Sequence, residues 1–220
     1  PPALDEVGVD PVKVRLDFGN QVTVMYTFED MVATVKVVSA LDVAHSLSDE
    51  LSFSSQIFPR KDILWWTNTR RGPIVAIWEE PKVRKFALQE RAMGEPRRFT
   101  IPMPGLIFLT QGGQPPWVYA TKRRPIKPAD LVYQAPLCNL FADGRSCPGS
   151  HKYPMAIGQI PDSFFRSFFS ATAELGNRSQ KFPQNVVHLW EFLAGKKTYP
   201  MSDLVKHGTV RDLMQMEVGR

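Results

Sequence analysis

The chain has 220 residues, of which 43% are hydrophobic and 22% are charged, a balance typical of a globular protein long enough to bury a core. Its net charge of +5 permits an acidic partner without requiring one, and no apolar run approaches the roughly 20 residues that span a bilayer. Two cysteines are too few for a disulfide framework, and residues 1–11 lack the basic start and apolar core of a secretion signal. We therefore expect a cytoplasmic protein made of one domain, or of one domain with an extension.

Alternating apolar and polar residues open the chain. Residues 12–18 and 21–28 alternate on either side of Gly19-Asn20, a pair typical of tight turns, and so predict a β-hairpin. Residues 31–38 predict a third strand. We therefore expect residues 1–38 to form a small antiparallel β extension.

Further strands are predicted in the middle of the chain. Residues 103–113 are the most apolar strand candidate and should lie at the centre of a sheet, with residues 117–122 returning antiparallel to them. Residues 82–88 either extend the strand before them or form a strand of their own. Trp65 and Trp66 must point to opposite faces, so one should be buried and the other exposed. The remaining strands are expected at residues 62–67 and 73–80.

Helical periodicity takes over near the end of the chain. The Phe-rich segment 161–175 predicts a helix that packs into the core, with Phe164 and Phe168 on one face. An earlier helix should run from Ser39 to about Phe53. Because strands and helices are largely segregated, we expect an α+β domain over residues 39–220. Other helices are expected at residues 185–195 and 201–208, and residues 211–217 are compatible with a fourth.

Both cysteines lie in the stretch 131–150. Cys147 stands between the turn Asp143-Gly144 and the Pro148-Gly149 pair, so its sulfur should be accessible and could act as a nucleophile. The alternative for Cys147 is a small buried hydrophobic residue. Cys138 is expected to be a core or strand-edge thiol.

Two other arrangements of these cysteines are possible. Cys138 could form a disulfide with Cys147. A zinc ion would need about four ligands, and only His151 is near in sequence. We therefore expect no metal site.

The segment from Asn139 to Cys147 resembles the active-site loop of ubiquitin-conjugating enzymes, in which an Asn stands eight positions before the catalytic Cys and a Gly lies between them. Longer stretches resemble protein B of the PRTRC cassettes, also described as family D of the prokaryotic ubiquitin-conjugating superfamily. The resemblance runs from about Ser39 to about Leu193. It rests on the strands containing WW, PGLIF and WVYA, on LVYQAP, on the pattern N-x-x-x-D-G-x-x-C-x-G-S, and on the Phe-rich segment.

Three positions depart from the general pattern of the ubiquitin-conjugating enzymes. Leu137 and Cys138 stand where these enzymes usually carry His and Pro, and Pro148 replaces a bulky apolar residue. Family D is understood to lack the His. The departures therefore concern transfer to lysine more than formation of the thioester.

The resemblance implies a fold with an N-terminal helix, an antiparallel β-meander, an active-site loop and C-terminal helices. It also implies that Cys147 accepts a ubiquitin-like modifier as a thioester from a ThiF-like activating enzyme and passes it to an acceptor. Asn139 would stabilise the oxyanion, or would only stabilise a turn. His151 would deprotonate the amine or activate the thiol, or would simply be solvated. No cofactor is implied, because the ATP chemistry belongs to the partner, and a JAB-type peptidase is a further expected partner.

Candidate binding residues surround this loop. Asp143 and Gly144 are expected chiefly as turn formers. The basic residues Lys122, Arg123 and Arg124 either dock an activating enzyme, an acidic modifier or nucleic acid, or serve solubility.

Two other functions compete with transfer. A non-catalytic binding module would keep the fold without the chemistry. A nucleic-acid-binding protein is the less favoured alternative, because no aromatic residues interleave with the basic loop.

Overall fold

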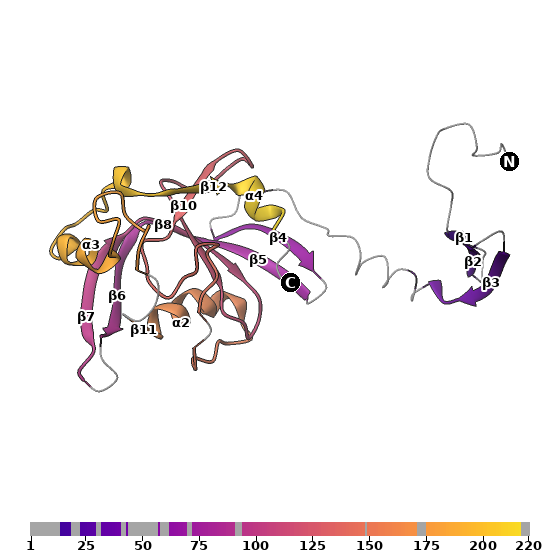
Figure 1. Ribbon diagram of the computed structural model, residues 1–220, viewed down its shortest axis with the longest axis horizontal. Helices are drawn as coiled ribbons and strands as arrows, with labels where there is room; N and C mark the ends of the chain where they lie inside the picture. The colour runs from indigo at the N-terminus through magenta and orange to yellow at the C-terminus, as the bar shows by residue number, and fades with distance from the viewer. Residues whose placement is uncertain are drawn as a thin grey trace. The chain divides into compact units, whose positions relative to one another are not determined.

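The computed structural model describes residues 14–18, 23–29, 32–40, 43, 57, 62–69, 72–90, 94–147, 149–170 and 175–216 (Figure 1). The chain divides into two compact units, residues 1–52 and 53–220. The boundary expected between residues 38 and 39 stays a prediction.

The smaller unit contains the three-stranded sheet expected from its alternation. Strands β1 (Val14–Phe18), β2 (Thr23–Glu29) and β3 (Val32–Val38) pair antiparallel in that order. Of the helix expected from Ser39 to about Phe53, the structure describes Ala40 and Val43 as helical, with the Val43 amide donating to Ser39. The rest of that helix lies outside the described residues.

The larger unit is built on a six-stranded antiparallel sheet in the order β12-β10-β9-β8-β5-β4. Strand β8 pairs with a strand on each side, which confirms its expected central place. All six of its residues are buried, because its alternating side chains pack into core clusters on both faces of the sheet. Trp65 is 1% exposed and Trp66 is 39% exposed, as their alternation requires. The strands are β4 (Ile63–Thr69), β5 (Gly72–Glu79), β8 (Gly105–Thr110), β9 (Trp117–Thr121), β10 (Leu131–Gln134) and β12 (Lys206–Thr209).

The larger unit also contains a second, three-stranded sheet. The sequence predicted a single antiparallel meander and did not predict this sheet. Strand β6 (Lys82–Gln89) is a strand of its own and pairs antiparallel with β7 (Arg97–Met103), and β11 (Phe168–Ser170) pairs parallel with β6. Pro104 has no N–H to donate to a ladder and stands between β7 and β8, where the chain changes sheet. Figure 1 shows these strands at the end of the larger unit that carries α3.

Two expected helices are partly wrong. The helix expected at residues 161–175 is observed as α2 (Ile160–Arg166); it ends at Arg166, and Ser167 turns the chain into β11. The repeated Phe pairs fit either structure, because Phe164, Phe165 and Phe169 are buried both before and after the change. Of the helix expected at 201–208, only the 3₁₀ turn η3 (Met201–Asp203) forms, and β12 follows because it can pair with β10.

The other two helices agree with expectation. Helix α3 (Val186–Leu193) is capped by Asn185, whose side chain accepts from the Val187 amide. Helix α4 (Val210–Met214) begins with a capping box formed by Thr209 and Asp212. None of the helices that the structure describes is both long and apolar enough to cross a membrane.

A cluster of aromatic rings joins the second sheet to the helices. The Phe86 ring lies edge-on to Phe169 at 5.2 Å and to Trp190 at 4.9 Å. The Trp190 indole N–H donates to the Pro136 carbonyl at 2.8 Å. The core therefore holds the backbone just before Cys138 against α3.

Truncating a ring of this cluster should destabilise the protein. We expect Phe169→Ala to lower the free energy of unfolding by about 3–5 kcal/mol, because it opens a cavity at a fully buried site. Val83→Ala is the control, since Val83 lies on β6 but is 49% exposed, and should change stability by no more than about 0.5 kcal/mol. Urea unfolding followed by tryptophan fluorescence measures both, and equal losses would contradict the packing of β11.

Candidate active site

Residues 139–147, here called the Asn139–Cys147 loop, form a short hairpin whose two ends meet. The Cys147 amide donates to the Asn139 carbonyl at 2.7 Å, and Leu140 forms an antiparallel bridge with Ser146. At the tip, the Gly144 amide donates to the Phe141 carbonyl at 2.9 Å. The separation of eight positions is therefore the length of a closed hairpin, and it brings Asn139 and Cys147 side by side.

Strand β9 and Pro116, the residue before it, hydrogen-bond to the second half of the loop. The Val118 amide donates to the Gly144 carbonyl at 2.8 Å, and the Ser146 amide donates to the Pro116 carbonyl at 3.0 Å. The Ser146 hydroxyl donates to the same carbonyl of Pro116. These bonds extend the main sheet into the loop.

Arg178 holds the loop from inside the protein. Its side chain is buried, and the guanidinium donates to the carbonyls of Leu140 at 2.5 Å and Phe141 at 2.9 Å. It also donates to the side-chain oxygen of Gln134, whose own amide group donates to the Ala142 carbonyl at 2.8 Å. Three consecutive carbonyls of the loop therefore find donors on Arg178 and Gln134.

The segment that carries Arg178 is fixed by a buried carboxylate. Asp203 accepts from the Ser179 hydroxyl at 2.9 Å, from the Lys181 amide at 2.8 Å and from the Tyr199 hydroxyl at 3.3 Å. Because Ser179 adjoins Arg178, this network places the guanidinium beneath the loop.

Asp143 and Gly144 form the turn, as expected. The Asp143 carboxylate accepts from the backbone amide of Arg145 at 3.1 Å and from its guanidinium at 2.7 Å. Gly144 has φ +87°, and a Cβ there would lie 2.6 Å from the Tyr119 ring, whose hydroxyl donates to the Asp143 carbonyl. Both residues therefore shape the turn through contacts within the protein.

The two cysteines have opposite environments, and both are free thiols. Cys147 is exposed, whereas Cys138 is completely buried. Burial raises the pKa of the Cys138 thiol to about 12. Cys138 therefore stays protonated in the core. Among the described residues there is no group of three His, Cys, Asp or Glu side chains that could hold a metal ion.

Strand β11 orients the Asn139 side chain. Asn139 has φ +60°, a left-handed conformation that Asn tolerates, and its side-chain oxygen accepts from the Ser170 amide at 3.0 Å. The bond fixes the plane of the carboxamide at the mouth of the hairpin.

Tyr153 lies close enough to Cys147 for the two charges to interact, and sequence reasoning missed it. Burial raises the pKa of the Tyr153 phenol to about 12, with a hydrogen bond to Ser167 lowering it and the Cys147 charge raising it. An aromatic residue six positions after the cysteine was the available signal. His151, a candidate from the sequence, packs edge-on against Tyr153 at 4.8 Å, and its Nε2 bonds to Ser163 at 2.9 Å.

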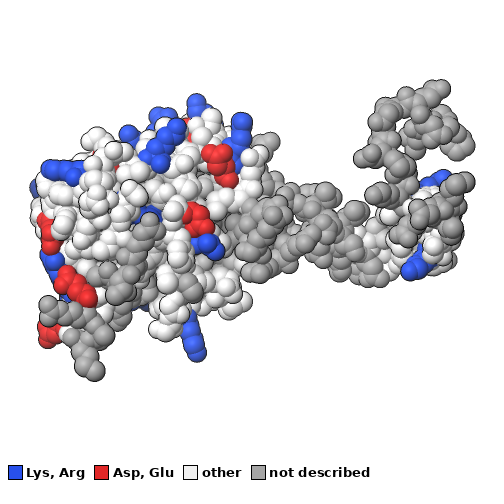
Figure 2. Space-filling view, viewed as in Figure 1, with Lys and Arg blue, Asp and Glu red and all other residues white. Residues whose placement is uncertain are grey.

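The basic residues lie at the start of the segment between β9 and β10. Lys122 and Arg123 are exposed, and the Lys122 ammonium lies 5.1 Å from the centre of the Tyr133 ring. Arg124 is half-buried and donates to the Ile63 carbonyl at 3.3 Å. Figure 2 shows Lys and Arg side chains along the edge of the larger unit that carries β10 and β12. The functional roles of these residues, and of the loop residues, stay predictions.

A side chain at Gly144 should distort the loop. We expect Gly144→Ala to lower the free energy of unfolding by at least about 2 kcal/mol, because it adds backbone strain and a clash with Tyr119. Gly149→Ala is the matched control: Gly149 also has positive φ, but nothing lies within 4 Å of its would-be Cβ, so only about 1 kcal/mol should be lost. Urea unfolding compares the two, and equal losses would argue against the contact with Tyr119.

One comparison with known proteins bears on this geometry. A model of prokaryotic E2 family D matches residues 39–207, a span that includes the Asn139–Cys147 loop and Arg178. Searches of the curated proteins and of the solved structures returned no match. The family match covers most of the chain and confirms the resemblance carried by the loop and its strands: the chain belongs to prokaryotic E2 family D.

Proposed function

We propose that this protein accepts a ubiquitin-like modifier as a thioester on Cys147 and transfers it to an acceptor. The observation that carries the proposal is the closed hairpin: the backbone of the exposed Cys147 is bonded to that of Asn139, whose carboxamide is oriented by Ser170. Membership of an E2 family supports the same chemistry. The modifier would arrive on a ThiF-like activating enzyme in a reducing cytoplasm.

The first step exchanges one thioester for another. The Cys147 thiolate attacks the carbonyl carbon of the modifier's terminal glycine, a new C–S bond forms, and the sulfur of the activating enzyme leaves as a thiolate. Because the bond broken and the bond formed are alike, the step needs access and a thiolate more than a large acceleration. The exposed position of Cys147 meets the need for access.

The second step needs stabilisation of negative charge. An acceptor amine attacks the Cys147 thioester and creates an oxyanion, which collapses with Cys147 as the leaving thiolate. The carboxamide NH₂ of Asn139 is our candidate donor, because the oxygen of the same group is bonded to Ser170. One such donor is worth about 3 kcal/mol.

Neighbouring residues would support these steps. Tyr153 is a neutral phenol near pH 7, as any tyrosine is, and its raised pKa of about 12 keeps it neutral at higher pH, so it adds no negative charge beside the thiolate. His151 is the candidate for taking the amine proton, since Ser163 holds its ring near Tyr153. Lys122, Arg123 and Arg124 are candidates for docking an acidic partner.

Thioester exchange should occur at Cys147 alone. We expect a synthetic peptide ending in Gly-Gly, presented as a 2-mercaptoethanesulfonate thioester at about pH 8, to form one adduct that dithiothreitol reverses. With a pKa of about 12, only about one Cys138 thiol in 10⁴ is ionised at that pH. Intact-mass spectrometry measures the adduct.

Variants locate this adduct. Cys138→Ala should keep it and Cys147→Ala should lose it. An adduct on Cys138, or none at all, would contradict the proposal and leave a non-catalytic binding module as the better account.

Removing the Asn139 amide should slow transfer without slowing loading. We expect Asn139→Gly, which tolerates φ +60°, to reduce aminolysis of the Cys147 adduct by excess free lysine about 100-fold. Asn139→Asp loses the same NH₂, but its carboxylate can still accept from the Ser170 amide. This variant therefore separates the loss of the oxyanion donor from the loss of the bond to Ser170. Unchanged aminolysis in both variants, measured as decay of the adduct mass, would reduce Asn139 to a turn former.

A further inference from the structure

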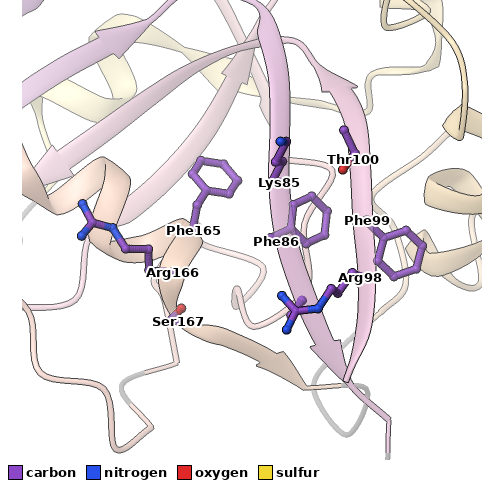
Figure 3. Close-up of a pocket in the computed structure, with 9 residues that line it drawn as sticks. Lys85, Phe86, Arg98, Phe99, Thr100, Phe165, Arg166 and Ser167 are labelled. Atoms are coloured by element: carbon purple, nitrogen blue, oxygen red, sulfur yellow. The ribbon is translucent and has the colours of Figure 1, made fainter. Parts of the chain in front are cut away.

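The second sheet carries a pocket of about 320 Å³ that the proposed transfer does not use. Its size is at the lower end of the range for small-molecule sites. Figure 3 shows side chains from β6 and β7 and the end of α2 around it. It is lined by Lys85, Phe86, Ala87, Arg98, Phe99, Thr100, Phe165, Arg166 and Ser167.

The strand register explains the hollow. Ala87 on β6 pairs with Arg98 on β7, and Lys85 pairs with Thr100, so these four residues share the outward face of the sheet. The small Ala87 side chain leaves a gap between larger neighbours. Ser167, together with the last residue of α2, closes the other side just before β11 joins β6.

Three cations border this hollow. Lys85, Arg98 and Arg166 are exposed, and within the described part of the chain none of them forms an ion pair. By contrast, the arginines next to Lys85 and Arg98 on the same strands do form ion pairs. Arg84 pairs with Glu79 and Asp162, and Arg97 pairs with Glu90 and Glu191.

The pocket lining adds two hydroxyl groups, of Thr100 and Ser167, and no carboxylate. Thr100 is the hydroxyl that can donate into the hollow, since the Ser167 hydroxyl already donates to the Phe164 carbonyl at 2.6 Å. Lys85, Arg98 and Thr100 share one face of the two strands, whereas Figure 3 shows the Arg166 guanidinium turned away from them. A guanidinium, an ammonium and a hydroxyl on that face match the oxygens and the double negative charge of a phosphate group.

We propose that this pocket binds a small phosphorylated molecule through its phosphate group. A concave site of this volume suits a ligand of nucleotide size rather than a protein surface. The proposal is independent of thioester transfer, because it concerns binding alone.

The test measures the binding of adenosine monophosphate to the full chain by isothermal titration calorimetry at low ionic strength. We expect binding of the nucleotide but not of adenosine, which lacks the phosphate. Arg98→Gln should weaken binding about tenfold, and Arg98→Gln with Lys85→Gln should abolish it. Lys206→Gln removes one charge from an exposed residue of β12 outside the pocket and should leave binding within about twofold.

Several results would overturn the proposal. One is no binding up to roughly 10 mM nucleotide. Another is equal binding of adenosine, and a third is equal weakening by Arg98→Gln and Lys206→Gln. Binding of a polyglutamate peptide without binding of the nucleotide would point instead to an acidic protein partner. Circular dichroism of each variant checks that the fold is kept.

Discussion

The Asn139–Cys147 loop depends on one buried guanidinium. Taking Arg178 out of water is costly unless its N–H groups find acceptors, and the carbonyls of Leu140 and Phe141 supply them. The same bonds give the buried Leu140 carbonyl a donor and add a second donor to the Phe141 carbonyl. The requirement therefore runs both ways: the loop completes the burial of Arg178, and Arg178 fixes the loop. Because the restraint acts from inside, the ends of the hairpin can stay at the surface, where Cys147 is exposed.

The change from α2 to β11 connects the core to this loop. Had the Phe-rich segment continued as a helix, no strand would present the Ser170 amide to the Asn139 side chain. The parallel pairing of β11 with β6 also places Phe169 against Phe86. Aromatic packing and the orientation of a polar side chain thus come from the same three-residue strand.

Local patterns in the sequence were enough for part of this structure. Residues 103–113 are apolar enough to mark the central strand β8, and Asp143-Gly144 marks the turn before Cys147. Strand β11 could not be predicted from the sequence, because its partner β6 lies far away in the chain and Phe pairs suit a helix equally well. The role of Arg178 could not be predicted for a related reason. An arginine among polar residues is expected to be exposed to water, and its acceptors become apparent only in the fold.

The replacement of the usual His-Pro pair by Leu137 and Cys138 follows from packing. Both side chains are completely buried in the hydrophobic core beside the backbone that Trp190 holds through Pro136. An imidazole at position 137 would lose water and would cost about 1–3 kcal/mol unless it found a new partner. In this chain an apolar pair therefore stabilises the approach to the loop, and the polar restraints come from Arg178 and Ser170. Presentation of the thiol then depends on the core and on two hydrogen-bond donors far away in sequence, which is why losing the His-Pro pair does not dismantle the hairpin.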